Sequence, residues 1–234
     1  MFRLFNTPVW FNGWDIIIES VSIIVALLIA LYSWRIYKLH KENRYAYFSF
    51  AFVLIAMGLL VKVLTGGILY FTPVRDVAAE VLRPIAGPGL KFSDLLYRSG
   101  FLFQMAPMLG AWLLIFFLSQ KPRARLTKFY EVSQIALFIY FILLISFVAN
   151  FRYSVFYLTS SVILGLVVLN YYKNYLNNRN YNAYRVMISF LLILIGNLFF
   201  VFVFLSSQLY VIGELFLLAG FLMLLQVYRK TTKR

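Results

Sequence analysis

Seven stretches of mainly apolar residues, most of them about 20 residues long, constrain this chain more than any other feature. A helix of that length crosses the hydrocarbon core of a bilayer, and only helices or closed barrels satisfy their backbone polar groups there. The sequence therefore predicts an all-α membrane protein, with one domain of seven transmembrane helices over residues 1–234. The expected spans cover residues 14–37, 45–71, 95–118, 130–149, 153–172, 184–205 and 209–228.

Composition agrees with this fold class and excludes several others. The chain is 63% hydrophobic and 13% charged, whereas a soluble domain is about one quarter charged. Its net charge of +14 is carried mostly by short loops between the spans, so we expect no nucleic-acid partner. Because the sequence has no Cys and one His, His40, we expect no disulfide, no metal site and no cofactor.

The distribution of Lys and Arg predicts the orientation of the chain in the membrane. Of the 22 basic residues, 15 fall on the side of the C-terminus, six on the other side, and Lys62 lies within a span. Basic loops remain in the cytoplasm, so we expect the N-terminus outside and the C-terminus inside, in the cytoplasmic membrane. Residues 1–13 have no cleavage-site pattern, so we expect no removable signal peptide.

One external segment, residues 72–93, is interrupted by Pro and Gly. Within it, Val74 to Leu82 has the pattern of a short amphipathic helix. Such a helix either lies on the membrane surface or covers a pocket.

Small and polar residues recur at helical spacing on three spans, which predicts faces that pack against other helices. Aromatic residues such as Trp34 and Tyr37 flank the first span and predict its interfacial belt. Pro107 cannot donate a backbone hydrogen bond, so we expect a helix kink there. The predicted packing faces consist of Glu19, Ser22, Ala26, Ala30 and Ser33; of Gly58, Lys62 and Gly66; and of Gly100, Gln104, Pro107 and Ala111.

Five polar residues lie well inside different spans, namely Lys62, Glu19, Glu214, Gln104 and Asn197. At ~1.5 Å per residue, they fall roughly 8 to 13 Å below the outer boundary. Polar residues at this depth are candidates for function, and together they predict an outward-opening pocket for a ligand or ion. The alternative is a structural ion pair between Lys62 and Glu19 or Glu214. One base between two acids has a net charge of −1, which would suit a proton or a cationic ligand.

The sequence lacks the motifs of the common membrane enzymes. It contains no HExxH, no GxSxG and no Gly-rich phosphate loop. No two Asp residues lie within the spans, which argues against an intramembrane aspartyl protease, and the last span lacks the Lys that would hold retinal. We therefore expect a protein that is not an enzyme and has no catalytic residues.

The segment SWRIYKLHKENRYAYFSFAFVLIAMGLLVK, residues 33–62, joins a basic loop to a helix start rich in Tyr and Phe. Together with the seven predicted spans, it resembles the seven-helix membrane modules of prokaryotic sensor proteins. Those proteins continue into a cytoplasmic output domain, whereas this sequence ends at Arg234. The resemblance thus implies a sensor that signals through a cytoplasmic or membrane partner.

The sequence is therefore compatible with three functions. The leading prediction is a non-enzymatic sensor-like or accessory membrane protein with an outward-facing polar pocket. The alternatives are a small transporter or channel that uses the same polar residues, and a structural subunit of a membrane complex. The basic inner loops are expected to bind anionic lipid, or to dock the partner.

Overall fold

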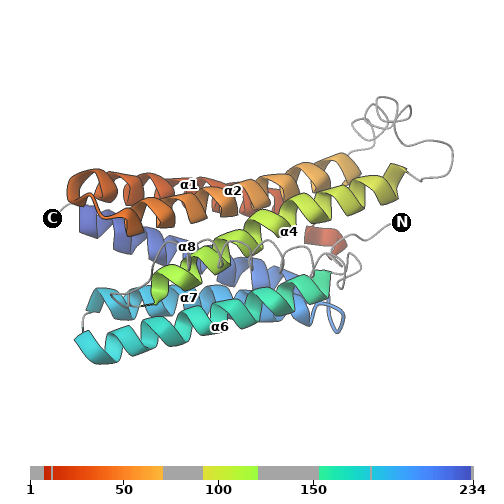
Figure 1. Ribbon diagram of the computed structural model, residues 1–234. Helices are drawn as coiled ribbons and strands as arrows, with labels where there is room; N and C mark the ends of the chain where they lie inside the picture. The colour runs from red at the N-terminus through yellow and green to blue at the C-terminus, as the bar shows by residue number, and fades with distance from the viewer. Residues whose placement is uncertain (1–7, 12, 71–91, 121–152, 180, 233–234) are drawn as a thin grey trace, which may run out of the picture.

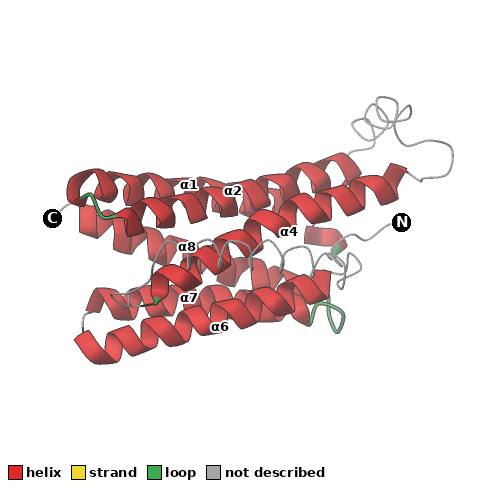
Figure 2. Ribbon diagram, in the orientation of Figure 1, coloured by secondary structure: helices red, strands yellow, loops and turns green. Residues whose placement is uncertain are grey.

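The described part of the chain is entirely helical in its regular structure (Figures 1 and 2). The computed structural model describes residues 8–11, 13–70, 92–120, 153–179 and 181–232. By length and composition, six helices are able to cross a membrane, which identifies a multi-pass membrane protein. The elements are η1 (Val9–Phe11), α1 (Trp14–His40), α2 (Asn43–Tyr70), α4 (Phe92–Ser119), α6 (Tyr153–Asn178), α7 (Tyr181–Val201) and α8 (Gln208–Thr232).

Six of the seven predicted spans coincide with these helices to within a few residues. The predicted span at 130–149 and the predicted amphipathic helix at Val74–Leu82 lie outside the described residues. The first helix continues three residues beyond its predicted end and stops where Lys41 adopts a left-handed backbone with φ 58°. There the Lys41 N–H donates to the Tyr37 carbonyl at 2.7 Å and closes the last turn. The predicted span at 184–205 ends earlier as a helix, at Val201, and continues as turns.

The six helices form a closed ring through their main contacts. In order around the ring, α1 packs against α2, α2 against α4, α4 against α6, α6 against α7, α7 against α8, and α8 against α1. The ring brings the first and last helices of the chain side by side (Figure 1). Side chains that point inward from α1, α2 and α8 therefore share one part of the interior.

The predicted packing face of α1 is confirmed. Glu19, Ser22, Ala26, Ala30 and Ser33 are all buried. Two side-chain hydrogen bonds join this region to α2: the Ser33 hydroxyl donates to the Tyr45 carbonyl, and the Ser49 hydroxyl donates to the Ala30 carbonyl, each at 2.8 Å. Such bonds suit an apolar surrounding, where polar side chains join helices.

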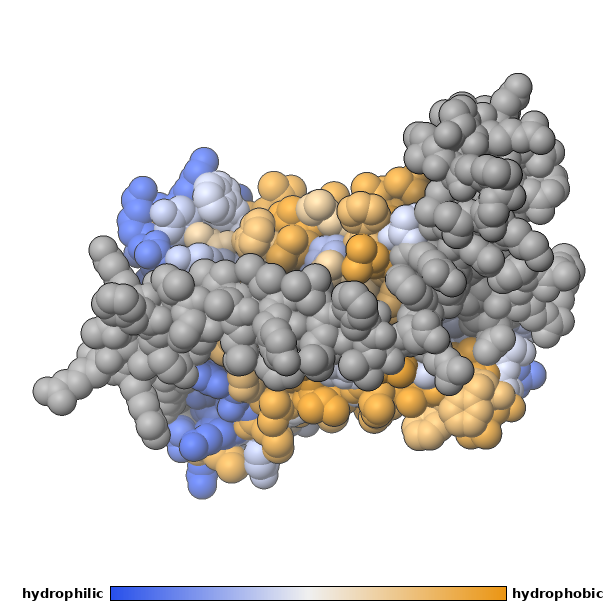
Figure 3. Space-filling view, turned by 45° about the vertical axis from the view of Figure 1, so that its right-hand side comes forward, coloured by the Kyte–Doolittle hydropathy of each residue, from blue (hydrophilic) through white to orange (hydrophobic). Residues whose placement is uncertain are grey.

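The opposite face of α1 is apolar and exposed. Ile17, Ile24 and Leu31 have exposed fractions of 54%, 58% and 64%, as expected of a helix that faces lipid. In Figure 3, apolar residues cover most of the surface that is coloured above and below the grey band, and hydrophilic residues gather at the left-hand end. We call this end the basic end, defined by five exposed residues: Lys38, Lys41, Arg44, Arg229 and Lys230.

Helices α7 and α8 approach each other closely at their glycine residues. A Cβ atom on Gly196 would lie 2.8 Å from the Gly213 carbonyl oxygen, and one on Gly220 would lie 2.8 Å from the Ser189 carbonyl oxygen. Small residues allow this approach, as in many membrane helix pairs. The pair consequently holds α8 in a fixed position relative to the rest of the ring.

Candidate functional site

Three of the five candidate residues meet in a buried charge cluster, which consists of Lys62, Glu19 and Glu214. The Lys62 Nζ atom lies 2.6 Å from Oε1 of Glu19 and 2.6 Å from Oε1 of Glu214. The three residues come from α2, α1 and α8, and their exposed fractions are between 1% and 4%. The predicted ion pair is thus confirmed in an extended form, because the ammonium group contacts both acids instead of one.

Aromatic side chains enclose this charge cluster. The Tyr210 hydroxyl donates to Oε1 of Glu19 at 3.2 Å. The Lys62 Nζ atom lies 5.0 Å from the centre of the Tyr210 ring and 5.5 Å from that of Phe200. At these distances the ring faces attract an ammonium group and stabilise it away from water.

The N-terminal segment covers the charge cluster at the end of the ring where α1 begins. In η1, Phe11 is buried and packs edge-on against Tyr210, with ring centres 6.3 Å apart. Asp15 holds the start of α1, since its Oδ1 atom accepts from the backbone N–H groups of Gly13 and Ile16 at 2.8 and 2.9 Å. The cluster is therefore covered by the chain's own aromatic residues at the end where α1 begins.

The other two predicted pocket residues are buried but make separate contacts. Gln104 accepts a hydrogen bond from the Tyr153 hydroxyl at 3.3 Å, which links α4 to α6. The Asn197 amide donates to the Ile193 carbonyl of its own helix at 2.9 Å. Pro107 lies inside α4, which continues through it. The kink at Pro107 and the outward-opening pocket stay predictions.

Sequence reasoning missed the residues around the charge cluster. Tyr210, Phe200 and Phe11 are aromatic residues in a chain with 17 Tyr and 25 Phe, so they do not stand out from other membrane residues. Only the position of Tyr210, four residues before Glu214 and hence on the same helix face, indicates that it belongs to the site. The Tyr210 ring, with its hydroxyl group, therefore lies on the same face of α8 as Glu214.

The charge cluster carries an unbalanced negative charge when all three groups are ionised. Burying an uncompensated charge costs several kcal/mol at the least, so the excess charge favours binding of a proton or a small cation. Among the residues that the structure describes, no group of three or more His, Cys, Asp or Glu side chains is placed to hold a metal ion.

Between α2 and α8, an apolar layer lies on the side of the charge cluster that faces the basic end. Along α2, the residues after Lys62 toward that end are Leu59, Ile55 and Phe52, and all three are buried. From α8, Phe221 meets Phe52 edge-on, with ring centres 6.1 Å apart. Polar side chains therefore do not continue from the cluster along this part of the interior.

Comparison with models of protein families, with curated proteins and with solved structures found no match for this chain.

Proposed function

We propose that this chain is a non-enzymatic integral membrane sensor, which detects a proton or small cation at the charge cluster and acts through a partner. One observation carries the proposal: a single ammonium group is shared by two carboxylates at 2.6 Å inside the bundle. A purely structural pair needs only one carboxylate for each ammonium. The second carboxylate adds a charge that something else has to neutralise.

A proton suits the observed geometry best. It needs no additional space, and the three side chains are almost fully buried. A larger cation would require the cluster to open, as in the outward-facing pocket predicted from the sequence. In either case, neutralising one carboxylate weakens its attraction to Lys62 and loosens one of the three helices.

The structure supports a sensor over a transporter because of the apolar layer. A transported ion that moved between α2 and α8 would have to pass Phe52 and Phe221, which are both fully buried. The same layer is suited to transmit a shift of α8, since Phe48 on α2 stacks on Tyr228 of α8 further toward the basic end, with ring centres 4.9 Å apart. Movement of α8 would therefore change the surface that a partner meets at the basic end.

The proposal includes seven spans, with the N-terminus outside and the C-terminus in the cytoplasm. Helices α4 and α6 run in the same direction (Figure 1), and such a pair requires an odd number of crossings between them. The orientation rests on the excess of Lys and Arg at the side of the C-terminus. On that side, Arg229 and Lys230 are exposed and available to a partner or to anionic lipid.

Spin labels test the sensor directly, because the chain has no Cys and introduced thiols are the only ones. We would label Tyr47→Cys on α2 and Arg229→Cys on α8, two exposed positions near the basic end. In lipid nanodiscs, we expect the distance distribution between the labels to change between pH 5 and pH 9, or on addition of NaCl. The variant Glu214→Gln has one acid for one base, so its distance distribution is expected to stay constant.

The control is Lys173→Gln, which removes an exposed charge outside the charge cluster and is expected to respond as the wild type does. A constant distance in the wild type, or an equal response in the Glu19→Gln/Glu214→Gln variant, would contradict the sensor. Proton or sodium flux in liposomes that depends on Glu214 would instead support the transporter.

A further inference from the structure

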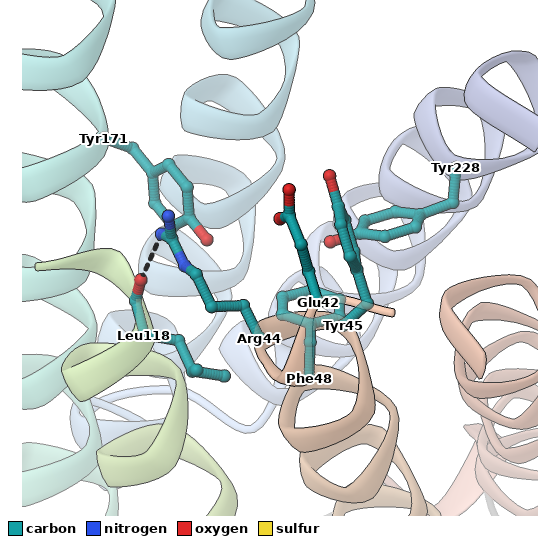
Figure 4. A pocket seen from close by; sticks show the side chains of 7 residues that line it. All are labelled: Glu42, Arg44, Tyr45, Phe48, Leu118, Tyr171 and Tyr228. Atoms are coloured by element: carbon teal, nitrogen blue, oxygen red, sulfur yellow. Dashed lines mark hydrogen bonds between the residues drawn. The ribbon is translucent and has the colours of Figure 1, made fainter. Parts of the chain in front are cut away.

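A second site lies at the basic end, far from the charge cluster, and is independent of the proposed function. It is a cavity of about 170 Å³ between α2, α4, α6 and α8 (Figure 4). The residues that line it are Glu42, Arg44, Tyr45, Phe48, Leu118, Tyr171 and Tyr228.

Opposite charges line this cavity without pairing. The Arg44 Nη2 atom donates to the Leu118 carbonyl at 2.7 Å, which directs the guanidinium group toward α4 and α6 and leaves further N–H donors for a ligand. Glu42 extends from the other side, beside Tyr45 (Figure 4). Within the described residues, the ion pairs are those of Lys62, so the Glu42 carboxylate has no cationic partner there.

Aromatic rings complete the cavity on the side of Glu42. Tyr228 stacks on Phe48 at an interplanar angle of 17°, and Tyr45 lies beside them (Figure 4). Aromatic faces next to a carboxylate attract ammonium groups, whereas the guanidinium fork of Arg44 matches a phosphate. The cavity thus presents an anion-binding group and a cation-binding wall to one ligand.

We propose that this cavity binds the phosphoethanolamine head group of a membrane lipid, with the phosphate on Arg44 and the ammonium group between Glu42 and the aromatic rings. We assign the phosphoethanolamine group to a membrane lipid because the cavity lies at the end of the helices, where lipid head groups are expected. Trp34 and Tyr37 form an aromatic pair near the same end of α1, with ring centres 5.1 Å apart, and such pairs mark the membrane interface. The exposed positions of Glu42 and Arg44 leave the mouth of the cavity open.

Native mass spectrometry of the full chain tests this assignment. The protein would be extracted from nanodiscs that contain equal amounts of phosphatidylethanolamine and phosphatidylglycerol, and the retained lipids would be counted. We expect the wild type to retain phosphatidylethanolamine with roughly tenfold preference, the effect of one charge-assisted hydrogen bond. Glu42→Gln is expected to remove the preference, and Arg44→Gln to lower the retention of both lipids.

The matched control is Arg229→Gln, the same change at an exposed residue of the basic end that does not line the cavity; it is expected to keep the preference for phosphatidylethanolamine. If Arg44→Gln fails to fold because the bond to Leu118 is lost, Glu42→Gln still tests the site. Equal retention of both lipids by the wild type would overturn the proposal. Water-soluble glycerophosphoethanolamine that displaces the lipid at equal concentration would overturn the assignment to a lipid.

Discussion

Lys62→Met is expected to destabilise the protein by about 3–5 kcal/mol, the usual cost of removing one partner from a buried ionic group. The substitution keeps most of the length of the side chain but leaves the carboxylates of Glu19 and Glu214 without the cation between them. Thermal unfolding of the purified protein in detergent measures the effect. Lys230→Met, at an exposed position of the basic end, is the control and is expected to change stability by less than about 0.5 kcal/mol.

Removing the acids distinguishes a structural ion pair from a sensing cluster. In the Lys62→Met background, replacing Glu19 and Glu214 by Gln is expected to restore most of the lost stability, since no buried charge remains. In the wild-type background, Glu214→Gln is expected to be neutral or stabilising, because it leaves Lys62 paired with Glu19 alone. Should Glu214→Gln destabilise the protein as strongly as Lys62→Met, both acids would be structural and the argument from excess charge would fail.

The helices and their inward faces follow from the sequence because both depend on local periodicity. The spans were predicted from the lengths of the apolar stretches. The burial of Ser22, Ala26 and Ala30 was predicted from their spacing on α1, and the structure confirms it. Lys62 was expected to point inward for the same reason, and the structure confirms it. Local spacing does not indicate which helices become neighbours, however, so the sequence left open whether Lys62 would pair with Glu19 or Glu214.

The order of helices in the ring decides that question. Helix α1 contacts both α2 and α8, and the acids of α1 and α8 therefore reach the same ammonium group. The cavity at the basic end depends on the ring in the same way, since Glu42 and Tyr228 are far apart in the sequence. Residues such as Phe11 and Tyr210 escaped notice because an aromatic ring in a membrane protein is more often a lipid contact than part of a site.

A second large loss of stability is expected from a substitution at the glycine contacts between α7 and α8. Gly196→Ala is expected to destabilise the protein by about 1–3 kcal/mol, or more if the helices cannot shift. The new methyl group would lie 2.8 Å from the Gly213 carbonyl oxygen and 3.1 Å from the Leu217 backbone nitrogen. Both atoms belong to the backbone of α8, so no side-chain rotation relieves the overlap and the two helices have to separate.

Gly165→Ala on α6 is the matched control, because a Cβ atom there would meet nothing within 4 Å. Ala has a higher helix propensity than Gly, which predicts that Gly165→Ala stabilises the protein by up to about 1 kcal/mol. The two Gly→Ala substitutions are therefore expected to change the free energy of unfolding in opposite directions. Equal effects would mean that α7 and α8 are not in close backbone contact.

The separation of α7 and α8 also has a consequence for the charge cluster, since Glu214 follows Gly213 directly on α8. Gly196→Ala is therefore expected to lower the stabilising effect of Lys62, which a double-mutant cycle with Lys62→Met would measure as non-additive stability changes.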